Sequence, residues 1–246
     1  MIDLTKGYVD YFQPLLVAST NRPIPDLSTM DLETKITWYE ALLSTAMIER
    51  ATLRNSDVNW DHQEKIFPYI KRILDWLRTT DFYTSPASTK YHDSAVGGLL
   101  DHTLKAYNEL VGLRSVPKFD SVVSDCWYSA VFVILVHDWC KIGRYEFYLK
   151  YVKNPDTDAW EQVPAFKYKD DDLTHLGHGT QSLITAMQFC NSKLTSLTFD
   201  EMAAIRWHMD SWDIGHYDEA DLAKCNEKIP MVRMIQFADQ LAITAY

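Results

Sequence analysis

The sequence of 246 residues is poor in the residues that interrupt helices, with 8 Gly and 9 Pro. This scarcity disfavours a turn-rich β-sandwich and favours a chain built mostly from helices. The four cysteines lack Cys-X-X-Cys spacing, so we expect reduced, buried thiols in a cytoplasmic protein rather than disulfides. We expect no signal peptide, because the first residues lack its basic and apolar regions. Apolar runs also fall far short of the ~20 residues that a membrane-spanning helix needs.

Positive charge is also scarce, since 24 Lys and Arg residues stand against 34 Asp and Glu residues, for a formal net charge of −10. A protein that holds long nucleic acid by its phosphates normally carries a basic surface, so such a partner is disfavoured. A small phosphorylated substrate stays compatible with an acidic chain, because bound divalent metals can supply local positive charge. The charge therefore leaves a small phosphorylated substrate open, and we expect no membrane partner. Whether the chain forms a homo-oligomer stays open.

Hydrophobic residues make up 47% of the sequence and aromatic residues 13%, which is ample for a sizeable core. Apolar residues recur at spacings of three and four, which is typical of amphipathic helices. The helices predicted in this way cover residues 31–47, 62–78, 98–113, 121–140, 175–191, 199–209 and 231–244.

A different pattern occupies residues 145–168, where aromatic and β-branched runs flank the turn residues 154–158. This pattern predicts a β-hairpin, which we expect to pack against the helices because an isolated hairpin is marginally stable in water. The predicted fold is thus all-α, with the hairpin inserted in a helical domain over residues 90–246. A helical extension over residues 1–89 precedes that domain.

Histidine and aspartate residues stand at the ends or on the apolar sides of several predicted helices. His137 and Asp138 close the apolar run 130–136, where both side chains are costly unless they are engaged. Taken alone, this pair could equally cap its own helix or meet water. The other residues in comparable positions are His102, His178, His208 and Asp239. Imidazole and carboxylate groups together suit Zn, Fe, Mn or Ni, and an aspartate can bridge two ions.

The order of these residues resembles the H…HD…D signature of the HD superfamily of metal-dependent phosphohydrolases. The resemblance covers about residues 90–245, which implies a helical HD domain. Residues 91–103 (YHDSAVGGLLDHT) and 137–142 (HDWCKI) are similar to the YhaM-type exoribonuclease and relaxase-associated subgroup. Cys140 and Asp101 depart from this pattern, because the family commonly has glycine and glutamate there. Neither departure changes a ligand.

By position, the resemblance implies a two-metal centre with six ligands. His102, His137, Asp138 and Asp239 would hold one divalent transition metal, and Asp138 would bridge to a second ion held by His178 and His208. The ions would be Mn, Fe, Ni, Co or Zn, with Mg as an alternative. Such ions would activate the hydroxide that attacks phosphorus. His175 lies three residues from His178 on the same predicted helix face and is the alternative ligand.

Three further residues are candidates for contact with the substrate. The resemblance implies that Lys141 directs its ammonium group at the substrate phosphate, as a catalytic and substrate-binding residue, and that His92 also binds substrate. Arg144 lies close enough in sequence to line the site. Each has a structural alternative, because Lys141 could meet the helix dipole, His92 could be an ordinary loop residue, and Arg144 could serve only the fold.

The function that these features predict is metal-dependent hydrolysis of a phosphate ester or anhydride of a nucleotide. Two alternatives use the same site, namely a 3′-5′ exonuclease and a cyclic-nucleotide phosphodiesterase. The exonuclease alternative is weakened because residues 1–89 look helical, whereas the YhaM-type enzymes carry an OB domain. A third alternative is a catalytically silent nucleotide-sensing module, although the presence of all six ligands argues against it.

Overall fold

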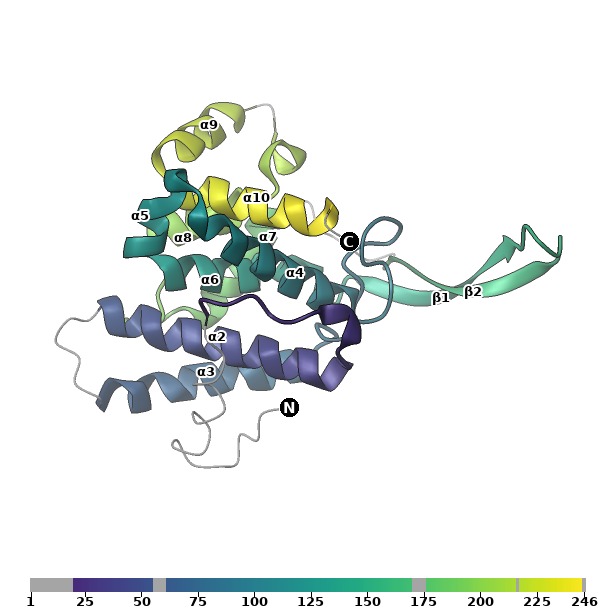
Figure 1. The fold of residues 1–246 in the computed structure, drawn as a ribbon, viewed down its shortest axis with the longest axis horizontal. Helices are drawn as coiled ribbons and strands as arrows, with labels where there is room; N and C mark the ends of the chain where they lie inside the picture. Colours follow the sequence, from purple (N-terminus) through teal and green to yellow (C-terminus); the bar gives the residue numbers. More distant parts are fainter. Residues whose placement is uncertain (1–19, 55–60, 170–175, 216, 245–246) are drawn as a thin grey trace.

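The computed structural model describes residues 20–54, 61–169, 176–215 and 217–244, with the side chains of 61–64 and 244 excepted. The chain is mostly helical, with a helical N-terminal region and one antiparallel hairpin, as the sequence predicts (Figure 1). The elements are α2 (Leu32–Arg54), α3 (Asp61–Thr79), α4 (Gly98–Gly112), α5 (Asp120–Asp125), α6 (Trp127–Val136), β1 (Tyr145–Lys153), β2 (Trp160–Tyr168), α7 (His178–Phe189), α8 (Phe199–Arg206), α9 (Glu219–Lys228) and α10 (Pro230–Thr244).

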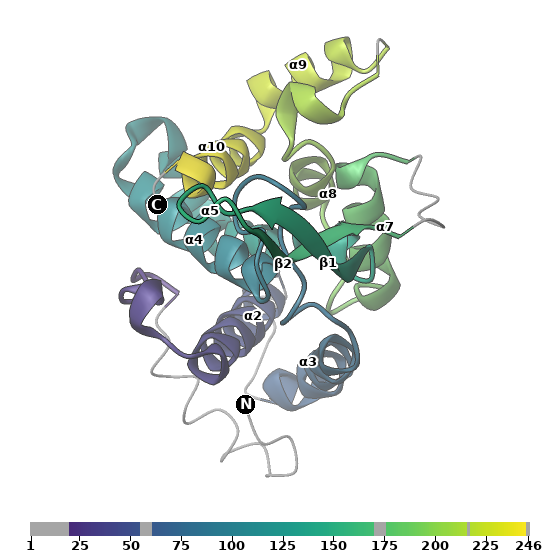
Figure 2. The same cartoon turned by 90° about the vertical axis from the view of Figure 1, so that its right-hand side faces the viewer.

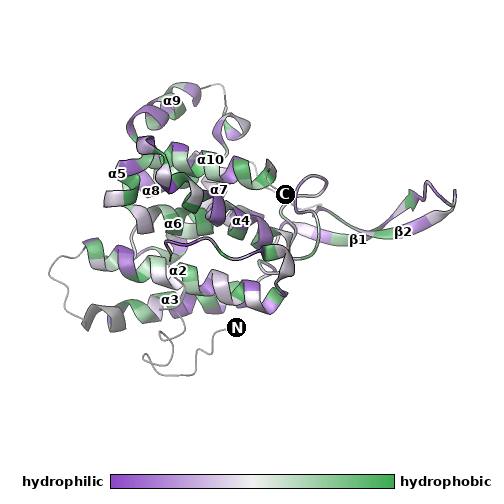
Figure 3. Ribbon diagram, viewed as in Figure 1, coloured by the Kyte–Doolittle hydropathy of each residue, from purple (hydrophilic) through white to green (hydrophobic). Residues whose placement is uncertain are grey.

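Helix α6 lies at the centre of the fold, in contact with α2, α4, α8 and α10. Apolar side chains lie on every face of this helix, and the residues from Ala130 to Val136 are all buried. A helix that is apolar all round is stable only when other elements surround it. The helices around it combine green and purple residues in Figure 3, as expected for helices with one buried and one exposed face.

The described N-terminal helices belong to the same hydrophobic core as the rest of the chain. Helix α2 packs against α6, and α3 packs against α2. The buried Tyr39 of α2 donates a hydrogen bond from its hydroxyl group to the Leu135 carbonyl oxygen at 2.9 Å. The indole nitrogen of Trp139 donates to the same hydroxyl group at 3.1 Å. The N-terminal region therefore supports the turn that follows α6.

The predicted helix over 121–140 is wrong as a single element, because it is divided at two points. Cys126 leaves the helical conformation, with φ −145° and ψ 28°, and separates α5 from α6. The second break follows Val136, where the Nδ1 atom of His137 donates to the Ile134 carbonyl oxygen at 2.7 Å. This bond satisfies a carbonyl group that the end of the helix leaves without an intrahelical partner. The short 3-10 turn η4 (Trp139–Lys141) follows.

The predicted hairpin over 145–168 is confirmed, with Tyr145 paired to Tyr168 and Lys153 paired to Trp160. Our expectation that it packs along the helices is wrong. Only its base is buried, at Tyr145, and the strands project away from the helical body (Figures 1 and 2). Cross-strand aromatic contacts stabilise the ribbon instead, including Phe147 with Phe166 at a centroid distance of 5.9 Å.

Within the described ranges, no single helix is both long and apolar enough to cross a membrane. The segments Pro117–Asp125 and Trp127–Lys141 reach the necessary length and composition only together, and they are bent by 94° relative to each other.

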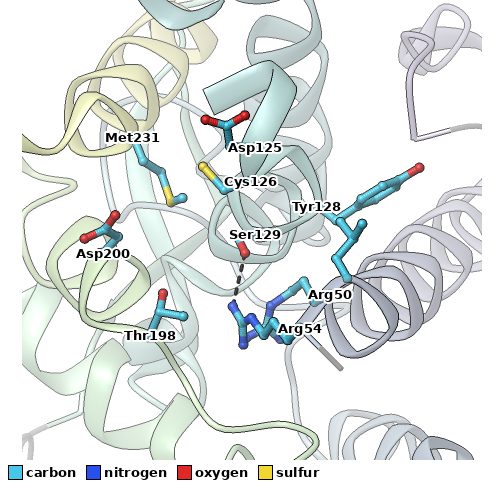
Figure 4. A pocket seen from close by; sticks show the side chains of 10 residues that line it. Arg50, Arg54, Asp125, Cys126, Tyr128, Ser129, Thr198, Asp200 and Met231 are labelled. Atoms are coloured by element: carbon cyan, nitrogen blue, oxygen red, sulfur yellow. Dashed lines mark hydrogen bonds between the residues drawn. The ribbon is translucent and has the colours of Figure 1, made fainter. Parts of the chain in front are cut away.

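A buried cluster of charged residues joins α2 to α8 at the other end of α6 from His137. Arg50 donates from Nε and Nη2 to the two carboxylate oxygens of Glu201 at 2.6 and 2.8 Å, and Arg54 also contacts this carboxylate. Arg54 donates to Ser129 Oγ at 3.1 Å (Figure 4). Burial alone raises the pKa of Glu201, but the two guanidinium groups outweigh this effect and lower the pKa below its usual value.

The Glu201→Ala substitution should lower the free energy of unfolding by about 3–5 kcal/mol, because it leaves Arg50 buried without its carboxylate. Urea denaturation measures this difference. The matched control is Glu227→Ala on the exposed side of α9, which should change stability by at most about 0.5 kcal/mol. The lowered pKa means that the ion pair stabilises the fold above pH 4.5 and is lost as the pH falls through the folded-state pKa. The difference between wild type and Glu201→Ala should therefore shrink in acid, and a constant difference would contradict this account.

Candidate metal centre

The six predicted ligands come from five parts of the chain and meet beside the end of α6. His102 lies on α4, Asp239 lies on α10, and His178 is the first residue of α7. The remaining ligands follow helices: His137 and Asp138 follow α6, and His208 follows α8. All of them are buried except His178, which is partly exposed.

Two of the histidines are oriented by the ends of their own helices. Nδ1 of His137 donates to the Ile134 carbonyl oxygen, and Nδ1 of His208 donates in the same way to the Ile205 carbonyl oxygen at 2.8 Å. A carbonyl oxygen only accepts, so Nδ1 of each ring carries a hydrogen, and in the metal-binding neutral form of the ring the lone pair lies on Nε2. Neither Nε2 atom has a hydrogen-bond partner among the described residues, although both are buried. This is the arrangement of histidines that bind a metal through Nε2.

The first group of potential ligands consists of His102, His137 and Asp239. Nε2 of His102 lies 2.9 Å from Asp239 Oδ1, and Nε2 of His137 lies 3.5 Å from the same oxygen. Two ligand atoms bound to one ion at 2.0–2.1 Å lie about 2.9–3.4 Å apart, depending on the coordination geometry. The spacing therefore fits a shared ion with little movement of the side chains.

Asp138 connects this group to two others. Its Oδ2 atom lies 3.5 Å from Nε2 of both His102 and His137, and its Oδ1 atom lies 3.6 Å from Nε2 of His208. Oδ1 is buried and has no hydrogen-bond partner among the described residues. Its carboxylate thus faces ligands on both sides, as a bridging carboxylate would.

The third group consists of Asp138, Cys140 and His178. We predicted that His178 and His208 share a second ion, whereas in the structure they fall in different groups that have Asp138 in common. Nδ1 of His178 lies 3.6 Å from the Cys140 sulfur. Burial lowers the pKa of His178, which keeps its ring neutral and able to bind a metal. His175, the alternative ligand, lies outside the described residues.

The carboxylates of the centre are ionised despite their burial. Burial alone raises the pKa of Asp138, but Lys141 and His137 outweigh it and hold the pKa well below its usual range. The pKa of Asp239 is lowered in the same way, because the hydrogen bond to His102 and the nearby His137 imidazole outweigh its burial. Burial alone lowers the pKa of Lys141, but the Asp138 carboxylate outweighs this effect and raises the pKa above its usual value, so Lys141 stays charged. The centre therefore presents anionic oxygens and imidazole nitrogens together, a donor set that suits divalent transition metals.

The three predicted substrate-binding residues lie near the centre in different environments. Lys141 is only 7% exposed, and its Nζ donates to Asp138 Oδ2 at 2.6 Å, so it is engaged with a predicted ligand. The ring of His92 lies 5.0 Å from that of His102. Arg144 lies at the base of the hairpin, with its guanidinium group 5.6 Å from the centre of the Tyr168 ring. Contact of these residues with substrate stays a prediction.

Two residues that contribute to the geometry were missed as functional candidates. Asp93 Oδ2 lies 4.0 Å from Nδ1 of His102, and both atoms are buried without a partner in the described structure. This approach requires Gly98, because a Cβ atom there would lie 1.9 Å from the Asp93 carbonyl oxygen. Asp213 accepts a hydrogen bond from the Gly179 amide at 2.8 Å and fixes the start of α7 beside His178. The sequence signal for Asp93 was its position directly after His92.

A cavity of about 240 Å³ lies at the opposite end of α6 and is lined by residues that include Arg54, Cys126 and Ser129 (Figure 4). It contains none of the six predicted ligands. Two arginines line this cavity, Arg50 and Arg54, and both are engaged by the Glu201 carboxylate.

The cluster is defined by its geometry alone, and its resemblance to the HD superfamily stays a prediction. Comparison of the chain with protein-family models, with curated proteins and with solved structures finds no match.

Proposed function

We propose that the chain is a metal-dependent phosphohydrolase that cleaves a phosphate ester or anhydride of a nucleotide. The observation that carries this proposal is that three ligand atoms of the cluster are buried without partners in the described structure, namely Nε2 of His137, Nε2 of His208 and Oδ1 of Asp138. Each buried polar atom left unsatisfied costs about 1–3 kcal/mol. Divalent ions between them would satisfy these atoms, at spacings that already resemble those between ligands.

Metals bound at this centre would supply an activated hydroxide and would neutralise charge on the phosphoryl oxygens. The protein residues position the reaction. Asp138 offers one oxygen to each side of the cluster, and its ion pair with Lys141 fixes the orientation of the carboxylate. Lys141 also adds a positive charge where the phosphate would bind. His92, beside His102, and Arg144, at the base of the hairpin, flank this position.

We propose a small nucleotide as substrate because the chain carries a net charge of −10. A protein that binds a polymer through several phosphates gains affinity from counterion release, which depends steeply on salt. Binding of one nucleotide would need only the metals and a few cationic side chains, for which Lys141 and Arg144 are the candidates.

A screen of nucleoside mono-, di- and triphosphates, cyclic dinucleotides and short oligonucleotides, each with Mn, Fe, Co, Ni, Zn or Mg, tests the proposal. We expect faster turnover of mononucleotides than of single-stranded DNA or RNA, with weak dependence on moderate salt. Release of phosphate, pyrophosphate or triphosphate identifies the bond that is cut. Processive degradation of a labelled oligonucleotide, with mononucleotides untouched, would contradict the choice of substrate and favour the exonuclease alternative.

A further inference from the structure

Cys140 is a buried cysteine whose sulfur lies inside the metal-ligand cluster. The side chain is 3% exposed, forms no disulfide, and belongs to the group that also contains Asp138 and His178. The Cys140 amide donates to the buried Ser182 hydroxyl group at 3.1 Å. This bond holds the backbone of the turn η4, and the ligand atoms of Cys140, Asp138 and His178 all lie within 4.8 Å of one another.

A second observation, independent of the cysteine, concerns the Asp138 carboxylate, which the Cys140 group shares with the group that contains His208. Asp138 is 3% exposed, and its Oδ1 atom has no hydrogen-bond partner among the described residues. Nε2 of His208 lies 3.6 Å from this oxygen and is also buried without a partner among the described residues. Two acceptor atoms that face each other in this way need a cation or a hydrogen between them.

The distance from the Cys140 sulfur to Nδ1 of His178 is 3.6 Å. A thiolate 2.3 Å and an imidazole nitrogen 2.0–2.1 Å from one tetrahedral ion lie about 3.6 Å apart. The plain alternative is a weak hydrogen bond from the thiol to the ring. That alternative accounts for the distance between Cys140 and His178 only, whereas a shared ion would also engage the Asp138 carboxylate of the same group.

We propose that Cys140 is a protein ligand of the second metal position, together with Asp138 and His178, and that its sulfur makes this position prefer Zn²⁺ or Co²⁺ to Mg²⁺. The inference rests on the proposed metal centre and adds the identity of a ligand and the class of ion. Thiolate ligands favour the softer transition metals, whereas Mg²⁺ prefers oxygen ligands. The thiol releases its proton to solvent as the metal–sulfur bond forms.

Absorption spectroscopy of the cobalt-loaded protein tests this ligand directly, with a readout that does not depend on activity. We expect the wild type to show a near-ultraviolet sulfur-to-cobalt charge-transfer band. Cys140→Ser should lose this band, and the zinc affinity of the second position should fall at least about tenfold. The matched control, Cys225→Ser on α9, removes a cysteine outside the cluster and should keep the band. Cys140→Ala replaces Cys140→Ser if the serine variant fails to fold.

The outcomes separate this inference from the proposed function. Bound cobalt with no charge-transfer band in the wild type, or a band that persists in Cys140→Ser and Cys140→Ala, would overturn the ligand assignment. Hydrolysis could still proceed in that case. A band that depends on Cys140 in a protein with no phosphohydrolase activity would support the ligand and contradict the function. Failure of the wild type to bind cobalt would overturn both.

Discussion

Replacing Asp138 should remove most of the bound metal and lower phosphohydrolase activity by at least about 10³-fold. Its two oxygens face His102 and His137 on one side and His208 on the other, so both ions would depend on it. Metal activation of water and stabilisation of phosphoryl charge lower the activation free energy by several kcal/mol. Each 1.36 kcal/mol of activation free energy changes the rate about tenfold. Metal analysis of protein purified without chelators and initial-rate measurements test this expectation.

The choice of variant matters because Lys141 is buried against this carboxylate. Asp138→Ala leaves the ammonium group without its partner and is expected to destabilise the fold. Asp138→Asn keeps an oxygen that can accept from Lys141, so it tests the metal with less damage to the fold. Asp156→Asn, in the exposed hairpin turn, is the control. Full metal occupancy in a folded Asp138→Asn protein would disprove the bridging role.

The second large effect should come from His178, which we expect to serve the second ion alone. His178→Ala should retain one ion per chain yet lose at least about 10²-fold in rate, because one of the two activating charges is gone. His102→Ala should instead disturb the first ion, since its Nε2 atom lies 2.9 Å from Asp239. His178 is partly exposed at the start of α7, so its loss should affect folding little.

The neighbouring histidine provides the internal control for this prediction. His175→Ala should leave metal content and rate unchanged. If His175→Ala has the larger effect and His178→Ala is neutral, the wrong histidine of the pair has been assigned.

The sequence predicts those parts of the fold that depend on periodic burial. Apolar spacing identifies most of the helices, and the aromatic and β-branched runs that flank the turn residues 154–158 identify the hairpin. It misses α9, because the segment EADLAKCNEK is mostly polar and buries only Leu222. It also misses the break at Cys126, where the apolar pattern continues through the bend. The projection of the hairpin away from the helices is not predictable from these runs, which specify strands but not the surface that covers them.

In the candidate site, too, some features could be predicted from the sequence and others could not. The ligands could be predicted because His and Asp at the ends of apolar runs are costly unless engaged. The contributions of Asp93 and Cys140 to the cluster could not be predicted, because they depend on how separate segments of the chain meet. Asp93 reaches His102 only because the chain before α4 folds back at Gly97 and Gly98. The engagement of Lys141 with Asp138 likewise depends on the tight turn after α6.

The metal content of the wild-type protein decides whether the His and Asp cluster is a metal centre. Protein purified without chelators, or stripped and then dialysed against Mn, Fe, Co, Ni or Zn, is analysed by elemental mass spectrometry. Because the centre offers buried imidazole and carboxylate ligands around a shared Asp138, the account predicts about one to two transition-metal ions per chain. It also predicts a rise in the melting temperature on loading, since a ligand that binds only the folded state stabilises it. A folded wild-type protein that retains no transition metal under any of these conditions, and whose melting temperature does not change, would contradict the account.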